Sequence, residues 1–235
     1  MAEQSTESSS QGSGPEFMAR VRHALGHSTQ GMAPKPDTVP ARPERLLRQV
    51  TASDPKRVSR WIAMAEKNGM VVRRSRAIAL TQAVEDCLRN SGVKSIMLNL
   101  SDVPEGSLRE DLKARGYQVS QWGDEHCAQS VYETDASVTD CRYGLADSGA
   151  LLVWSDSGFG RSTTLTVPLH IVLLPATRIV ADMIDALPRV RRDAGGLIPS
   201  NVVIINGPSK TADIEMNLVT GVHGPKFVQV IVIDD

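Results

Sequence analysis

The sequence predicts an α/β protein with a largely parallel sheet flanked by helices. Short apolar runs, too short to be buried helices, alternate with helical segments along the chain. The runs are continuously apolar, which is typical of strands that are covered on both faces. At 235 residues the chain is long enough to bury a large core without a disulfide or a metal.

The N-terminal region differs from the rest of the chain in composition. Residues 1–14 are mostly Ser, Gly, Gln and Glu, so a disordered tail is expected. Residues 15–26 are a predicted amphipathic helix, whose apolar side chains recur every four residues from Phe17. Residues 27–43 contain four prolines and form a predicted linker. A helix this short is marginal alone, so we expect it to dock on its own body or on a partner, and the sequence does not choose between them.

The remaining residues, 44–235, are predicted to form the α/β domain. Gly or Asn follows several of its helical segments, as expected at helix C-termini. The predicted helices cover residues 54–68, 77–90, 108–115, 179–190 and 209–219. The predicted strands cover residues 70–74, 93–100, 150–154, 170–174, 202–205 and 228–233.

Charge and cysteine content argue against several classes of function. The formal net charge of −1 argues against a dedicated nucleic-acid binder. Cys87, Cys127 and Cys141 have no CxxC spacing, so neither a disulfide framework nor an iron–sulfur cluster is expected in this chain. No metal-binding pattern occurs. No apolar stretch reaches 18 residues and the first residues lack the pattern of a secretory signal, so we expect a cytoplasmic protein without a membrane span.

Polar loops between Tyr143 and Pro225 contain the candidate functional residues. Ligands of open α/β sheets bind beyond the carboxyl ends of strands, so the loops after apolar runs are the first places to expect a site. One loop follows the strand at 202–205 and opens the helix predicted at 209–219, where free N–H groups suit a small carboxylate or phosphate. Its candidate ligand-binding residues are Gly207, Ser209, Lys210, Thr211 and Asp213. Helix capping by Ser209 is the alternative interpretation.

Two other loops supply further candidate ligand-binding residues. Gly160, Arg161 and Ser162 follow the strand at 150–154, and an arginine fork beside a flexible glycine suits an anion. The alternative is a flexible hairpin with a solvated arginine. Asp147 and Ser148 lie in an ordinary turn sequence before that strand and mean little alone.

Two histidines are candidate catalytic residues. His170 begins a predicted strand, and His223 lies in a glycine-rich turn between two predicted elements. A histidine in such a place can act as an acid–base group, but a structural histidine is commoner.

Five segments, taken in order, resemble one protein family. They are Gly144 to Leu151, Gly160 to Ser162, Pro168 to Ile171, Gly207 to Glu215 and Leu218 to Pro225. This series is similar to that of LUD-domain proteins, and its GPSKTADIE and GVHGP segments are specific. The resemblance is strong over residues 140–235 and weak over the body from Arg45. Lys210 stands where arginine is common in the family, which keeps the positive charge without the bidentate geometry.

The resemblance implies more than the residues show by themselves. It implies the fold of the ribose-5-phosphate isomerase and CoA-transferase-like superfamily. It implies a non-iron–sulfur subunit of a bacterial system that oxidises L-lactate to pyruvate, with iron–sulfur clusters in the partner subunits. We expect such a subunit to bind lactate, pyruvate or a cofactor through Arg161, Ser209, Lys210 and Thr211, with His170 or His223 near the reacting carbon. Two alternatives stay open. One is an autonomous enzyme acting on a phosphorylated or CoA-linked small molecule, with Glu215 or Asp213 as the candidate carboxylate, and the other is a regulatory or assembly module.

Overall fold

The computed structural model describes residues 14–24, 26, 50–51, 53–89, 91–125, 127–156, 158–196, 198–212 and 218–234. The chain divides into two units, residues 1–46 and 47–235. In the first unit, helix α1 (Gly14–Ala24) matches the helix expected at 15–26, and its Phe17 and Met18 side chains are exposed. The linker predicted at 27–43 and all but the last residue of the predicted tail lie outside the described residues.

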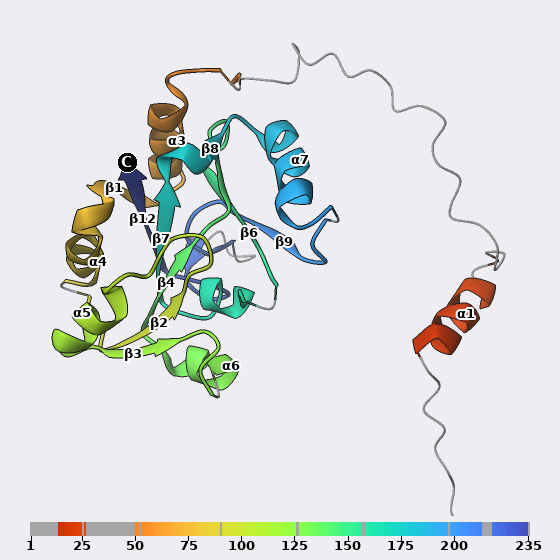
Figure 1. Cartoon of the computed structure of the whole chain (residues 1–235), viewed down its shortest axis with the longest axis horizontal. Coiled ribbons are helices and arrows are strands. Elements are labelled where there is room, and N and C mark those ends of the chain that lie inside the picture. The colour runs from red at the N-terminus through yellow and green to blue at the C-terminus, as the bar shows by residue number, and fades with distance from the viewer. Residues whose placement is uncertain are drawn as a thin grey trace, which may run out of the picture. The chain divides into compact units, whose positions relative to one another are not determined.

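The second unit is built on a six-stranded parallel sheet (Figure 1). Its strands are β1 (Val71–Arg76), β2 (Ser95–Asn99), β3 (Gln118–Gln121), β4 (Ala136–Asp140), β7 (Leu169–Pro175) and β12 (Phe227–Asp234). They are arranged in the order β1-β12-β7-β4-β2-β3, and every neighbouring pair is parallel. The prediction of a largely parallel sheet in an α/β fold is therefore confirmed.

The side of the sheet on which the chain adds its next strand changes between β2 and β4. After β2 the chain continues to β3 on one side, whereas after β4 it continues to β7 on the other side. Two adjacent strands whose connections leave in opposite directions open a crevice at their carboxyl ends. The fold therefore provides a place for a ligand beyond Asn99 and Asp140.

A second, four-stranded sheet was not predicted from the sequence. It contains β5 (Tyr143–Leu145), β6 (Ala150–Trp154), β8 (Ile179–Val180) and β9 (Val202–Ile205), in the order β8-β5-β6-β9. Strand β6 is antiparallel to both β5 and β9, and β8 is parallel to β5. A continuously apolar strand such as β6 is covered on both faces, and that pattern does not reveal which sheet it joins.

Side chains alternate across the strands and so divide the core into layers. On β7, Ile171 and Leu173 pack with helices α4 (Leu80–Leu88) and α5 (Leu108–Ala114) on one face of the large sheet. Val172 and Leu174 pack on the other face with the small sheet and helix α3 (Arg57–Lys67). Helix α7 (Met183–Asp193) covers the outer face of the small sheet.

Short helices complete the described elements. They are α6 (Cys127–Ser130) and the 3-10 helices η1 (Ala77–Ala79), η2 (Val131–Glu133), η3 (Arg161–Thr164) and η4 (Ala176–Arg178). The helix predicted at 77–90 is thus η1 followed by α4. Among the described helices, none combines the length and the apolar character required to cross a membrane.

The helix predicted at 209–219 is wrong. The described residues of this segment form a hairpin in which β10 (Lys210–Ala212) pairs antiparallel with β11 (Leu218–Thr220). Tertiary pairing explains the difference, because the Ser209 N–H donates to the Pro225 carbonyl at 2.9 Å and the Ser209 carbonyl accepts from the Gly221 N–H at 3.0 Å. The backbone is therefore held by a loop distant in sequence, which outweighs local helix propensity.

Two other differences have the same origin in tertiary pairing. The helix predicted at 179–190 begins later, because residues 179–180 form β8 on β5 and Asp182 then caps α7 by accepting from the Asp185 N–H at 3.0 Å. The sequence also did not predict β3, β4 and β5. Strand β4 carries Ser137 and Thr139, which are fully buried although polar, so it has no continuous apolar run.

Helix α3 packs closely against the turn before β6 and is hydrogen-bonded to the start of that strand. Trp61 is fully buried, and its Nε1 donates to the Ala150 carbonyl at 3.0 Å. Gly149 has φ of +72°, and a Cβ at this position would lie 2.4 Å from the Ala65 backbone nitrogen. Only glycine meets both the backbone and the space requirement here.

We predict that Gly149→Ala destabilises the protein much more than Gly92→Ala. Gly92 has a similar φ of +68° and no atom within 4 Å of the place that a Cβ would occupy, so it isolates the backbone cost. The Gly149 variant should lose about 1–3 kcal/mol more, because its methyl group overpacks the contact with α3. Urea unfolding of the two variants measures this difference, and equal losses would show that α3 is free to move away.

Candidate functional site

The crevice at the carboxyl ends of β2 and β4 contains an open cavity of about 710 Å³. This volume is within the usual range for small-molecule sites. Its walls are the loop after β2, Arg142 just after β4, residues 154–156 at the end of β6 and residues around the end of α7. We call it the Arg142 cavity. It lies where the sheet topology places a ligand, and segments distant in sequence converge on it.

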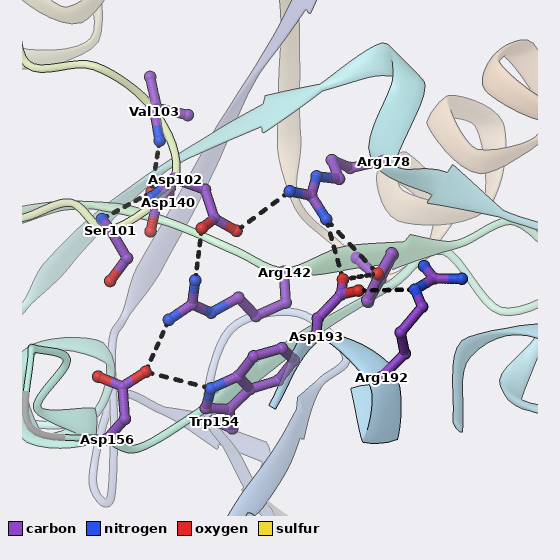
Figure 2. A network of polar contacts seen from close by, with 11 residues as sticks. Ser101, Asp102, Val103, Asp140, Arg142, Trp154, Asp156, Arg178, Arg192 and Asp193 are labelled. Carbon is purple, nitrogen blue, oxygen red and sulfur yellow. Dashed lines mark hydrogen bonds and ion pairs between the residues drawn. The ribbon is translucent and has the colours of Figure 1, made fainter. Parts of the chain in front are cut away.

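The guanidinium of Arg142 is held in a fixed plane (Figure 2). Its Nη1 donates to Asp102 Oδ1 at 2.6 Å, and its Nη2 donates to Asp156 Oδ2 at 2.8 Å. The Trp154 ring stacks under the guanidinium, with 4.5 Å from Cζ to the ring centroid, and Trp154 Nε1 also donates to Asp156 Oδ2 at 3.2 Å. Arginine is suited to such a site because its planar fork both stacks and hydrogen-bonds.

A second arginine extends the network away from Arg142. Arg178, at the end of η4, lies 3.6 Å from Asp102 Oδ2 and 3.3 Å from Asp193 Oδ2. Tyr143 donates a hydrogen bond to Asp193, and Arg192 donates to the other oxygen of Asp193 at 3.1 Å. Carboxylates and guanidinium groups therefore alternate from Asp156 to α7 (Figure 2).

The environment shifts the titration of this second group of residues. Burial and the hydrogen bond with Asp193 raise the pKa of the Tyr143 phenol. Burial works against ionisation of Asp193, but the hydrogen bonds from Tyr143 and Arg192 lower its pKa overall. Burial likewise opposes the charge of Arg178, and Asp102 and Tyr143 raise its pKa. The network therefore stabilises the charged carboxylate and guanidinium and the neutral phenol.

Asp140, the last residue of β4, fixes the loop that carries Asp102. Its Oδ2 accepts the backbone N–H groups of Ser101, Asp102 and Val103 at 2.8, 2.5 and 2.9 Å. Asp140 is buried, so these charge-assisted bonds are shielded from water. The loop after β2 is thereby tied to the end of the neighbouring strand, which directs Asp102 towards Arg142.

The charged side chains around the cavity are balanced. Asp102, Asp156 and Asp193 face three arginines in the network, so the charges are balanced. Among the described residues, no group of three or more His, Cys, Asp or Glu side chains is arranged to hold a metal ion. The arrangement offers fixed donors, acceptors and an aromatic face to a small polar molecule.

Three of the residues predicted from sequence come together elsewhere, at the end of α3. Lys210 Nζ donates to the Asn68 carbonyl at 3.2 Å, and Gly207 packs so closely that a Cβ would lie 2.6 Å from the same oxygen. Asn68 Nδ2 donates to the Ser148 carbonyl at 2.7 Å. The neighbouring Asp147 donates its N–H to the Ala181 carbonyl at 3.0 Å. The contacts of Asn68 join the small sheet and the hairpin to the end of α3.

Gly160, Arg161 and Ser162 lie at the start of η3. The Gly160 carbonyl accepts from Asn99 Nδ2 at 3.0 Å, and a Cβ on Gly160 would meet the Trp122 ring at 2.0 Å. Arg161 is exposed, and the Ser162 carbonyl accepts from the Thr166 hydroxyl at 2.9 Å. This segment therefore packs over the end of β2.

One argument for ligand binding by the hairpin residues does not hold in the structure. Ser209 and Thr211 do not begin a helix, so the helix N-terminus expected to bind an anion is absent from the described part of this segment. Asp213 and Glu215 lie outside the described residues. His223 is exposed in the loop before β12, and ligand or catalytic roles for these side chains stay predictions.

His170 is fully buried in the middle of the large sheet. Its Nε2 lies 2.9 Å from Thr139 Oγ1 on β4. Burial lowers its pKa from 6.5 to about 3, so the imidazole is neutral in the folded protein at neutral pH. Of the two roles that the sequence left open, this environment favours the structural one.

Sequence reasoning missed most of the residues around the Arg142 cavity. Asp102, Asp140, Arg142 and Arg178 were not among the candidates, although each lies at or just after the end of a parallel strand. The usable signal was the series Asp140-Cys141-Arg142 shortly before the apolar run at 150–154. That signal has meaning only once β4 is known, and β4 itself was not predicted.

The sequence profile of the LUD domain matches residues 58–233, which is most of the chain. The chain belongs to the LUD-domain family. The matched part of this LUD-domain protein includes both sheets and the Arg142 cavity.

Several relatives carry the name lactate utilization protein C. The protein from Halalkalibacterium halodurans is 28% identical over 225 residues, which cover 93% of this chain and 96% of that protein. The protein from Shouchella clausii is 39% identical over 121 residues, covering 50% of this chain and 53% of that protein. The Bacillus subtilis protein is 34% identical over 134 residues, covering 54% and 55%. This LUD-domain chain thus spans about half the length of several relatives in these alignments.

A solved structure supports the fold of this LUD-domain protein. The crystal structure of a DUF162 family protein from Deinococcus radiodurans matches with a TM-score of 0.58 at 18% identity. The match covers 76% of this chain and 97% of that one. At this identity the likeness concerns the fold alone.

We predict that Asp140→Asn loosens the loop after β2. The neutral amide is a weaker acceptor for three backbone N–H groups, so unfolding free energy should fall by about 1–3 kcal/mol. Hydrogen exchange at residues 101–103 should become faster, as measured by NMR. Asp135→Asn is the matched control, because Asp135 Oδ2 accepts from Lys94 and Ser95 at the opposite end of β2. If Asp140→Asn leaves exchange at 101–103 as slow as Asp135→Asn does, Asp140 does not hold the loop.

We also predict an acid-dependent loss of stability that originates at His170. The unfolded chain binds a proton near pH 6.5 and the folded chain only near pH 3, so stability falls as pH drops through this window. The slope from this one group is about 1.4 kcal/mol per pH unit at most. Urea unfolding of the wild type and of His170→Gln between pH 7.5 and pH 4 should show a shallower slope in the variant. Parallel slopes would contradict the assignment.

Proposed function

We propose that this LUD-domain protein takes part in lactate utilization, as the subunit without iron–sulfur clusters in a system that oxidises L-lactate to pyruvate. The observation that carries the proposal is the alignment with lactate utilization protein C of Halalkalibacterium halodurans, which extends over nearly the whole of both chains. The role of the chain in such a system would be to bind a small ligand and to contact the redox subunits.

The cysteines support placing the clusters in partner subunits. Cys87 and Cys141 are free and buried. Burial raises the pKa of both thiols, and for Cys141 it does so strongly, aided by Asp140 and Asp102. The ligands of one cluster must converge on one place, and these two thiols lie in different core layers. Their separation supports a proposal in which the clusters belong to the partners.

The Arg142 cavity is the proposed ligand site. It is large enough for a small carboxylate, and it combines a guanidinium, an indole N–H and hydroxyl groups among the residues that line it. The cations of the cavity are already paired with aspartates, which gives a phosphorylated or CoA-linked ligand less support than a monocarboxylate. The exposed cluster of arginines that a phosphate dianion prefers is not found among the described residues that line it.

Deletion of the gene in the natural host tests the proposal. The deletion strain should stop consuming L-lactate but should grow normally on pyruvate, because only the step before pyruvate is blocked. The full-length tagged chain should restore consumption and should copurify with proteins that show iron–sulfur absorption. Unchanged L-lactate consumption in the deletion strain would refute the proposed function.

A further inference from the structure

Arg142 is held by two carboxylates that differ in how firmly they are fixed. The Asp102 side chain is 28% exposed, its backbone N–H is held by Asp140, and its two oxygens contact Arg142 and Arg178. The Asp156 side chain is 40% exposed, whereas the Arg142 side chain between them is 10% exposed. Asp156 is therefore the more exposed of the two partners, and Asp102 is the more firmly held.

The Oδ2 atom of Asp156 lies where two side-chain N–H donors converge on one carboxylate oxygen. It accepts from Arg142 Nη2 at 2.8 Å and from Trp154 Nε1 at 3.2 Å. Both donors are positioned independently of Asp156, because Arg142 is also held by Asp102 and Trp154 is mostly buried at the end of β6. The other contact of the Asp156 carboxylate is local, since its Oδ1 accepts the N–H of Gly158 at 2.8 Å. Rotation of one exposed side chain would leave the two donors in place.

We propose that Asp156 is an internal stand-in for the ligand carboxylate, and that a small 2-hydroxy or 2-oxo monocarboxylate displaces it from Arg142 and Trp154. The proposal rests on the proposed function and names the ligand class of the same cavity. Exchange of one carboxylate for another keeps an ionised acceptor on Arg142 and preserves both hydrogen bonds. The displaced Asp156 side chain stays charged at the rim of the cavity, where it is hydrated, and the ligand shifts the population between the two states.

Two serines and an apolar wall complete the lining of the same cavity. Ser101 and Ser155 line it beside Arg142 and Trp154. Ile198 and Pro199 offer an apolar wall for a short aliphatic end.

The charge of the network selects against dianions. A phosphate in the place of Asp156 would put a second negative charge near Asp102 and Asp193, with no further cation gained. A neutral alcohol would leave the Arg142 N–H without an ionised acceptor. A monocarboxylate is the ligand that replaces Asp156 without either cost.

Binding of L-lactate to full-length Asp156→Asn tests the inference. The neutral amide competes more weakly for Arg142, so the Kd for L-lactate should fall by about threefold to tenfold relative to the wild type, as measured by calorimetry. Pyruvate should gain similarly, and propane-1,2-diol, which has no carboxylate, should not. Trp154 fluorescence should respond to L-lactate, and Trp154→Phe should remove that response.

Asp193→Asn is the matched control variant. It removes the same charge from a residue that lines the same cavity, but Asp193 contacts Arg178, Tyr143 and Arg192 rather than Arg142. Its effect on the Kd should be clearly smaller than that of Asp156→Asn. Arg142→Lys should weaken L-lactate binding in either background, because lysine cannot supply the same fork.

Three results would overturn the inference. They are an unchanged Kd in Asp156→Asn, an equal gain in Asp193→Asn, and a gain for inorganic phosphate larger than that for L-lactate. Near-ultraviolet circular dichroism checks that each variant is folded, so that a loss of structure is not mistaken for a loss of binding. The deletion strain tests the proposed function separately: if it loses L-lactate consumption while Asp156→Asn binds no better, only the inference about Asp156 is wrong.

Discussion

The Oδ2 atom of Asp140 accepts three consecutive backbone N–H groups, and the geometry of the Arg142 cavity depends on that contact. The bonds tie the loop after β2 to the end of β4 at the point where the sheet topology opens a crevice. They orient Asp102, which then fixes Arg142 and meets Arg178. A neutral side chain at position 140 would leave backbone donors of a partly buried loop poorly satisfied.

Strand β4 is anchored at both of its ends by a carboxylate of this kind. Asp135, just before the strand, accepts from the backbone of Lys94 and Ser95 at the start of β2, and these hydrogen bonds lower its pKa. Asp140 accepts backbone N–H groups in the same way at the far end of β2. The register of the two central strands is thus set by charge as well as by the ladder between them. Rigid strand ends are what a small, shaped ligand site requires.

The Arg142 network couples three structural layers through charges. Asp102 follows a strand of the large sheet, Trp154 ends a strand of the small sheet and Asp193 ends α7, and each contacts an arginine of the network. A paired charge in a half-buried site costs less than an isolated one, because each ion retains a partner and some hydration. The proposed exchange of carboxylates at Arg142 has the same advantage, since the guanidinium keeps its ion pair with Asp102 throughout.

The sequence alone determined the class of the fold and several elements with their bounds. Continuous apolar runs gave β6 and β9 at the predicted residues, and spacing gave α1, α3 and α5 within a few residues. The ordered segments from Gly144 to Pro225 indicated the LUD family, which the matching profile confirms. These features depend on neighbouring residues or on the order of short motifs, so they can be recognised in the sequence.

Only the tertiary structure decided the division into two sheets, the hairpin at 210–220 and the Arg142 cavity. A helix was predicted at 209–219, but pairing of Ser209 with Gly221 and Pro225 accompanies a hairpin in the described residues of this segment. The buried polar strand β4 is stable because Ser137 and Thr139 find partners in η3 and β7, which no local pattern records. Asp102, Arg142 and Asp193 are brought together from distant segments by strand order. Sequence spacing does not predict such contacts, because the interacting elements meet only when the sheets are assembled.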